Sequence, residues 1–432
     1  MIDAGRITVD VLTGQESKPG DIRVKRMSLT NERRFNLMDS LAKQSNGGCR
    51  NAVPEAFRLS PCAHLVALDA AERAAAGITE EDRRVLDGGL AERALMLEAL
   101  LENVHLLIVD ASRLASVPVS ADALGMLQTA RTRFSGIIKT LLGFNLVTSQ
   151  VDMEALGAAH DEIDDLAVSC GKILEDHVFG MRPLHFFAMS RPEQYWDWAN
   201  ASMTPAALLV VKCRSLSNTF GTFDCLPVPE PGKLVFPMFA DEIYYRLRNE
   251  TNFEAEPVYN RRTCHTGALV REAGHPLVRA LCETTGYSST TLFAARLLDA
   301  AALWAELSHL GAAHLPDPYQ VYTLQLPETY GSAAYTLTAW GLMTHAAGFK
   351  HSRSGLEHYH ALVTPAEWMF APEGPGQQAL ESVVRCLKRH EMPLGEEDVK
   401  NLVRLALFGF DPCTTLDIRI RPAPKPEAQE AS

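Results

Sequence analysis

The sequence predicts a mainly α protein with small β elements. Long segments repeat apolar residues at the 3.6-residue spacing of a helix that buries one face. Segments with period-2 alternation are short and lie at the N-terminus and within residues 320–365. With 432 residues, 47% of them hydrophobic, the chain is long enough to bury a large core. We expect a single domain over residues 1–420.

The first expected element is a β-hairpin at about residues 5–26. Ile7, Val9 and Val11 alternate with polar residues, and a turn containing Pro19-Gly20 precedes a second alternating run from Ile22.

The helical core is expected to follow. In residues 90–107, Leu95, Leu100 and Val104 form an apolar stripe, and Gly77 follows an Ala-rich segment where a helix C-terminus is expected. The expected helices are residues 63–76, 90–107, 121–142, 153–174, 276–283, 290–310, 377–389 and 396–408.

Three regions lack this helical pattern. Residues 180–260 are rich in aromatics, Pro and Gly, which indicates short strands mixed with irregular segments. Residues 321–326 and 356–363 alternate as strands. Residues 421–432 are Pro-rich and are expected to be a disordered tail. The aromatics Phe186, Phe187, Tyr195, Trp196 and Trp198 are interpreted as core residues rather than a ligand site.

Composition excludes several classes of protein. The net charge of -12 argues against a nucleic-acid surface. No apolar run approaches the ~18 to 20 residues of a membrane span, and no secretory signal is visible, so we expect a cytoplasmic protein. The nine cysteines include no Cys-x-x-Cys pair, which argues against a disulfide framework or a zinc ribbon. Most of these thiols are expected to be small buried groups.

Two short motifs stand near the two ends of the chain. One reads Asp411-Pro412-Cys413. The other runs from Phe57 through Ser60-Pro-Cys62-Ala-His64 into the Ala-rich segment that ends at Gly77.

These motifs resemble those of NiFe hydrogenase large subunits. That family has Asp-Pro-Cys-x-x-Cys-x-x-His near its C-terminus and Arg-x-Cys-Gly-x-Cys-x-x-x-His before an Ala-rich helix, and His64 and Gly77 fall in register with the second pattern. Residues 260–271, 275–278 and 363–374 are similar to segments of accessory homologues, in the same order. The whole set is similar to the HupK/HoxV-type hydrogenase maturation proteins, degenerate relatives of the large subunit.

The resemblance implies a hydrogenase large-subunit-like helical core without a working metal centre. It places Phe57, Ser60, Cys413 and Leu416 at the four thiolate positions, and Arg419 at the histidine position. A nickel–iron centre depends on soft thiolate ligands, and of these side chains only Cys413 can supply one. We therefore expect neither hydrogenase catalysis nor stably bound nickel.

The resemblance implies instead a non-catalytic scaffold in hydrogenase maturation. Such a protein would transiently hold the Fe(CN)2CO fragment on its way from a small HypC-type chaperone to the hydrogenase large subunit. Cys413, together with Cys62 or with His64, would bind the fragment. Accessory homologues generally have a cysteine at the place of Ser60, so either Cys62 replaces it through a locally shifted loop, or this chain binds iron weakly or not at all.

Alternative interpretations remain open at this point. In the second interpretation, the chain is a catalytically inactive large-subunit relative with a structural or regulatory role in a complex. Cys62 would then be a buried thiol, and His64 would cap the helix or pack against it. A third alternative is an unrelated iron enzyme that uses His358 and His360, which lie two residues apart on one face of a strand.

Overall fold

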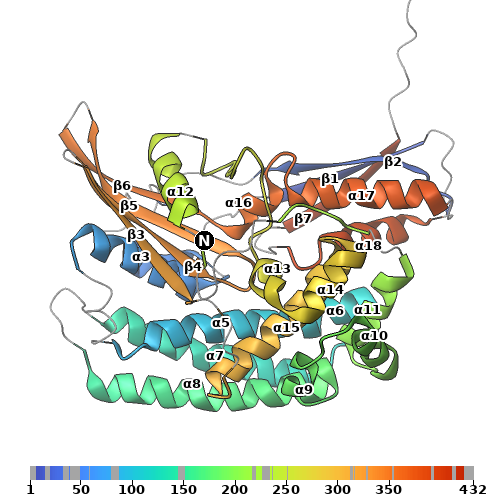
Figure 1. The fold of residues 1–432 in the computed structure, drawn as a ribbon, viewed down its shortest axis with the longest axis horizontal. Coiled ribbons are helices and arrows are strands. Elements are labelled where there is room, and N and C mark those ends of the chain that lie inside the picture. Colours follow the sequence, from blue (N-terminus) through green and yellow to red (C-terminus); the bar gives the residue numbers. More distant parts are fainter. Residues whose placement is uncertain are drawn as a thin grey trace, which may run out of the picture.

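The computed structural model describes residues 6–422 except 15–19, 33–37, 39–48, 58, 79–86, 145–150, 217–219, 226–233, 236, 251, 312–314, 316, 327–328, 353–354, 391–393 and 411–414. Helices make up most of this part of the chain, and two small sheets lie to one side of them (Figure 1). This arrangement confirms the predicted mainly α fold with small β elements.

A layer of long helices forms the base of the molecule in Figure 1. It contains α5 (Leu90–His105), α7 (Ala121–Gly143) and α8 (Met153–Ile173), and α15 (Ser289–Leu307) packs against α5 and α8. Nearly every residue of α15 is buried, as expected of a helix that is apolar around its whole circumference. All four helices lie where the apolar spacing predicts them.

α5 and α8 each continue into a π-helical turn, which the sequence did not predict. η1 (Leu106–Asp110) follows α5, η2 (Leu174–Phe179) follows α8, and the two turns contact each other. The chain then continues from η1 into α6 (Ala111–Ala115).

The prediction of strands in residues 180–260 was wrong, because the described part of this region is mainly helical. Its helices are α9 (Pro183–Phe187), α10 (Pro192–Ala201), α11 (Pro205–Leu216) and α12 (Pro237–Asn249). Each begins with proline, whose missing N–H needs no partner in the first helical turn. The aromatic residues lie in or against the core, as predicted, with Phe186, Tyr195 and Trp198 buried.

The remaining helices surround α15 or lie beside the sheets. They are α2 (Cys49–Ala56), α3 (Pro61–Ala75), α13 (Ala268–Arg271), η3 (Glu272–Gly274), α14 (Pro276–Thr285), α16 (Pro365–Phe370), α17 (Pro375–His390) and α18 (Glu396–Ala406).

The first sheet joins both ends of the described chain. β1 (Arg6–Thr13) pairs antiparallel with β2 (Val24–Asn31), where the sequence predicts a hairpin, and parallel with β7 (Thr415–Pro422). The strand order is β2-β1-β7. β7 was not predicted, and its last two residues, 421–422, belong to this sheet rather than to the tail expected from residue 421.

The second sheet is an antiparallel meander in the order β3-β4-β5-β6. Its strands are β3 (Tyr319–Leu326), β4 (Thr329–Leu337), β5 (Leu342–Ser352) and β6 (Gly355–Val363). α3 packs across β4 and β5, and the hydroxyl of Ser332 on β4 donates to the carbonyl of Ala71 on α3.

None of the helices in the described part of the chain is long and apolar enough to cross a bilayer.

Candidate functional site

The N-terminus of α3 is capped by two buried carboxylates from α5. Ser60 precedes the helix in the left-handed conformation, with φ 49° and ψ 42°. Its N–H donates to Glu102 Oε1 (2.7 Å), and its hydroxyl contacts both carboxylate oxygens at 3.1 and 3.0 Å. The N–H groups of Cys62 and Ala63 donate to Glu98, both at 2.8 Å. The backbone N–H groups of Ser60, Cys62 and Ala63 at this helix start are thus satisfied by carboxylates.

This setting keeps Cys62 in the thiol form. The side chain is fully buried, and burial together with the carboxylates of Glu98 and Glu102 raises the pKa of the Cys62 thiol well above its ordinary value. Burial and Glu102 also raise the pKa of Glu98, against the backbone N–H bonds that lower it. A thiol next to two acidic groups is a poor metal ligand, because ligation requires the thiolate.

We therefore expect Cys62 to resist alkylation in the folded protein. Iodoacetamide attacks the thiolate, so Cys62 should be modified more slowly than Cys282, which is only half-buried and whose pKa is raised to about 11. Peptide mapping after labelling at mildly alkaline pH measures both rates in one sample. Faster labelling of Cys62 than of Cys282 would contradict the assignment of a protonated, inaccessible thiol.

His64 follows on the same turn of α3 and forms a buried pair with His345 on β5. Its Nδ1 lies 3.0 Å from His345 Nε2, and its ring stacks on Phe57 with centroids 3.6 Å apart. The other ring nitrogen of His345, Nδ1, is buried and has no partner. A buried lone pair without a partner is tolerated better than a buried N–H, so we assign the hydrogen on His345 to Nε2. His345 then donates to His64, and His64 carries its own hydrogen on Nε2.

In this arrangement His64 has no lone pair available for a metal, because its Nδ1 accepts from His345 and its Nε2 carries the hydrogen. A ligating imidazole needs a lone pair on the nitrogen that faces the metal. At the first two positions where the resemblance implies thiolates, this chain has Phe57 and Ser60. The Phe57 ring stacks on His64, and the Ser60 hydroxyl donates to Glu102.

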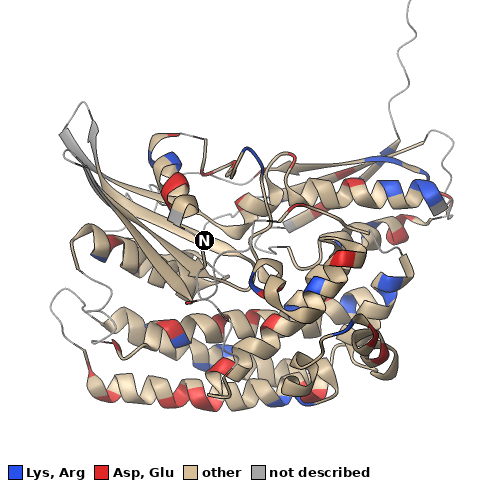
Figure 2. Cartoon of the chain, in the orientation of Figure 1, with Lys and Arg blue, Asp and Glu red and all other residues tan. Residues whose placement is uncertain are grey.

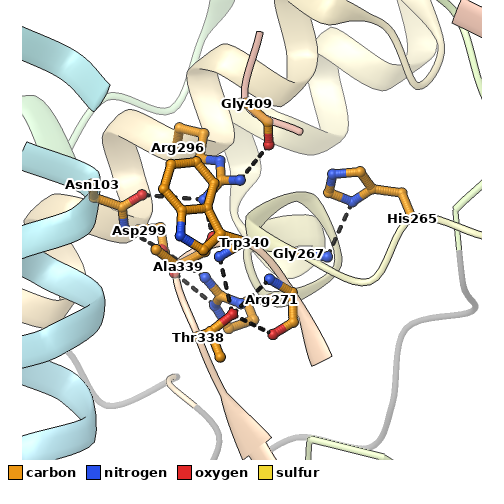
Figure 3. Close-up of polar contacts among 11 residues, drawn as sticks. Asn103, His265, Gly267, Arg271, Arg296, Asp299, Thr338, Ala339, Trp340 and Gly409 are labelled. Carbon is orange, nitrogen blue, oxygen red and sulfur yellow. Dashed lines mark hydrogen bonds and ion pairs between the residues drawn. The ribbon is translucent and has the colours of Figure 1, made fainter. Parts of the chain in front are cut away.

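A second polar network surrounds Arg296, deep on α15 (Figure 3). The guanidinium donates to the carbonyls of Ala339 and Gly409 and to Asn103 Oδ1 (3.3 Å), and it lies 4.9 Å from the centre of the Trp340 ring. Gly409 is two residues before Asp411. Arg296 thus connects the turn after β4 and the segment after α18 to the central helix.

One turn along α15, Asp299 is fully buried and bound by two partners. It accepts hydrogen bonds of 2.8 and 2.7 Å from Arg271 and one of 2.7 Å from Asn103 (Figure 3). Because Asn103 also contacts Arg296, the two arginines belong to one network.

His265 lies beside this network. Its Nδ1 accepts the N–H of Gly267 at 3.1 Å, and its ring packs against Phe223 and Phe410. Burial, with Arg296 and Arg271 nearby, lowers the pKa of His265 well below its ordinary value, so the ring is neutral. The ring therefore carries its hydrogen on Nε2, a buried atom with no partner.

The structure brings together some of the residues singled out from the sequence and leaves others apart. Cys62 and His64 share the first turn of α3. Cys413, with residues 411–414, lies outside the described part of the chain. Leu416 and Arg419 lie on β7, where Leu416 lines a cavity of about 180 Å³ and Arg419 pairs with Asp417 at 2.7 Å.

The two histidines of β6 do not form a metal site with other described residues. The side chain of His358 falls outside the described part, and His360 Nδ1 lies 4.0 Å from Glu72 Oε1. Burial, assisted by Asp69, raises the pKa of Glu72 to about 7. No group of three or more His, Cys, Asp or Glu side chains among the described residues is arranged to hold a metal ion.

Sequence reasoning missed Glu98, Glu102, His345, Arg296 and Asp299. A signal for four of them was present, because Arg296 and Asp299 interrupt an otherwise apolar helix, and Glu98 and Glu102 are one turn apart beside an apolar stripe. Charged residues in such places are buried with partners, although the sequence does not say which.

Comparisons with known proteins give the fold. Neither a family model nor a curated protein matches this sequence. A variant of the NiFeSe hydrogenase of Desulfovibrio vulgaris Hildenborough, pressurized with oxygen gas, aligns with a TM-score of 0.50 and 13% identity over 95% of this chain and 99% of that one. A second such structure gives 0.49 at 13% identity over 95% and 98%. A reduced, active NiFeSe hydrogenase from Desulfomicrobium baculatum gives 0.48 at 13% identity over 92% and 95%. The chain therefore has a hydrogenase large-subunit-like fold.

Proposed function

We propose that this chain is a non-catalytic accessory protein in the assembly of the NiFe centre, a scaffold that transiently holds the Fe(CN)2CO fragment. The observation that carries the proposal is the N-terminus of α3 within a hydrogenase large-subunit-like fold. There Phe57 packs on His64 and Ser60 is held by Glu102, at the two positions where the resemblance implies thiolates.

A resident nickel ion does not fit these residues. Nickel in such a centre needs several thiolates, whereas Phe57 and Leu416 carry no donor atom and the nearby Cys62 is a protonated thiol.

The iron fragment is a smaller load, and Cys413 is the thiolate proposed to hold it. Cys62 is the second proposed ligand, and it has to lose its proton against Glu98 and Glu102 before it binds iron. Because deprotonation of Cys62 costs free energy, the iron fragment is held weakly and is released readily, as a carrier requires. His64 would have to release the hydrogen on its Nε2 before it could bind iron, because its Nδ1 accepts from His345.

The proposed partners follow from the role of a carrier. A small HypC-type chaperone would deliver the fragment, and a hydrogenase large subunit or its maturation complex would receive it, in the cytoplasm. Neither nucleic acid nor a membrane has a part in this proposal.

One observation favours the alternative of an inactive relative with a structural or regulatory role. The N–H groups of Ser60, Cys62 and Ala63 at the start of α3 already donate to the carboxylates of Glu102 and Glu98, so the fold there needs no bound iron fragment.

Metal analysis of the anaerobically purified protein separates these functions. From cells that make hydrogenase, we expect substoichiometric iron, no nickel, and the infrared bands of cyanide and carbonyl ligands. Cys413→Ala should abolish iron and bands, and Cys282→Ala, at a half-buried thiol elsewhere, should retain both. Wild-type protein without iron or these bands would support the structural alternative. Stoichiometric nickel would contradict a non-catalytic role.

A further inference from the structure

A cleft of about 750 Å³ is lined by residues between Ile108 and Pro205, none of which belongs to α3. Three segments enclose it: the loop between α6 and α7, the end of η2, and the loop between α10 and α11. Its walls are mainly apolar and include Val117, Val119, Phe179, Trp198 and Met203. A volume within roughly 300–1,000 Å³ is that of a ligand-binding site. We call it the π-turn cleft.

Both π-turns contribute to this cleft. Ile108 of η1 and Phe179 of η2 line it, and the two turns contact each other. Gly180 ends η2 in the left-handed conformation at φ 64°, and a Cβ there would lie 3.2 Å from Ser202 Oγ. π-turns are rare and occur frequently at functional sites. Two of them side by side at one cleft indicate a shaped site rather than a packing defect.

The rim of the cleft combines an exposed apolar side chain with acidic groups. Met203 is 80% exposed, more than any other large hydrophobic residue in the described part of the chain. Asp176 lines the cleft and is exposed, as are Glu175 next to it and Arg182 next to the lining residue Met181, so both signs of charge occur around the cleft (Figure 2). Asp122 lies 3.5 Å from His177, and its own side chain is 79% exposed. The described residues that line the cleft include Asp176 but neither lysine nor arginine.

We propose that the π-turn cleft is a docking site for a basic amphipathic segment of a partner protein. A large apolar side chain of that segment fits between Trp198 and Met203, where it removes apolar surface from water. Lysine or arginine on either side of it meets Asp176 and Asp122, which selects a cationic partner over an acidic one. This proposal does not depend on the assembly role, because it uses no residue of the candidate metal site.

A peptide built only of leucine and lysine in a helical pattern is the probe, and the same peptide with glutamate in place of lysine is its counterpart. Fluorescence anisotropy with the full chain should show the lysine peptide binding at least about tenfold more tightly than the glutamate peptide. Hydrogen exchange should slow at residues 176–181 and 201–205 only when the lysine peptide is present.

Two variants and two matched controls locate the binding. Met203→Ser and Asp176→Lys should each weaken the lysine peptide about tenfold. Met153→Ser and Glu154→Lys make the same kinds of change on exposed residues at the opposite end of α8, about 30 Å away, and should leave binding unchanged. All four positions are on the surface, so the melting temperature confirms that each variant is folded.

Several results would overturn the proposal. Equal binding of the two peptides would mean that the acidic rim selects nothing. Equal weakening by the control variants, or slowed exchange elsewhere, would place the binding on another surface. If an apolar dye fills the cleft and the peptide does not displace it, the cleft is a small-molecule site instead.

Discussion

Replacement of Asp299 by alanine is expected to lower the free energy of unfolding by about 3–5 kcal/mol. The carboxylate is fully buried and accepts hydrogen bonds from Arg271 and Asn103. Its removal leaves the Arg271 guanidinium, itself only 5% exposed, as a buried charge without its carboxylate. Urea unfolding followed by circular dichroism measures the loss.

The matched control is an exposed ion pair of the same type. Arg133 and Glu162 lie 2.5 Å apart on α7 and α8, with side chains about one-third exposed. Glu162→Ala should cost less than about 1 kcal/mol, since exposed pairs gain little. If both variants lose the same free energy of unfolding, burial does not explain the contribution of the Arg271–Asp299 pair to stability.

The helical layer could be predicted from the sequence because its signals are local. α7 begins after Ser120 and α8 after Asp152, and both side chains accept hydrogen bonds from the first turn of the helix. Together with the apolar spacing, these caps determine where each helix begins. The π-turns were missed because a π-turn keeps helical composition and changes only the hydrogen-bond spacing.

Individual strands were missed where tertiary packing overrides local composition. β4 and β5 lie within the β region predicted for residues 320–365, but they are rich in alanine and glycine, which do not favour strands. These small residues permit the close approach of α3. β7 follows Asp411-Pro412-Cys413 and pairs with β1, a partner some 400 residues away in sequence. Propensity cannot detect such a pairing.

In the candidate site too, the features that depend on local sequence could be predicted, and those that depend on tertiary packing could not. The sequence identified Cys62 and His64 near the start of α3, where the structure has them. It could not indicate that Glu98 and Glu102 would cap that helix, because this depends on how α5 crosses it. Nor could it pair His64 with His345, 281 residues further along the chain.

His345 is expected to make the protein markedly less stable in acid. Burial, with His360 nearby, lowers the pKa of His345 from 6.5 to about 3. The unfolded chain therefore binds a proton below pH 6.5 that the folded chain does not accept until about pH 3. The stability that this neutral ring contributes is complete above pH 6.5 and is lost as the pH falls through that window. At 1.36 kcal/mol per pKa unit, the loss is about 4–5 kcal/mol across the window.

The variant His345→Gln isolates this effect, because glutamine retains a hydrogen-bonding side chain that does not titrate. Urea unfolding at several values between about pH 4 and pH 7 should show a shallower dependence of stability on pH in the variant, by about one proton. Glu72 acts with the opposite sign: its pKa is raised to about 7, so it stabilises the fold when protonated and that contribution fades as the pH rises through 7. Glu72 is present in both proteins, so the difference in pH dependence between them reports the titration of His345.

His309→Gln removes a 73% exposed ring and is the control for loss of an imidazole. If wild type and His345→Gln lose stability in parallel on acidification, His345 is not held neutral, and the hydrogen assigned to its Nε2 toward His64 loses its support.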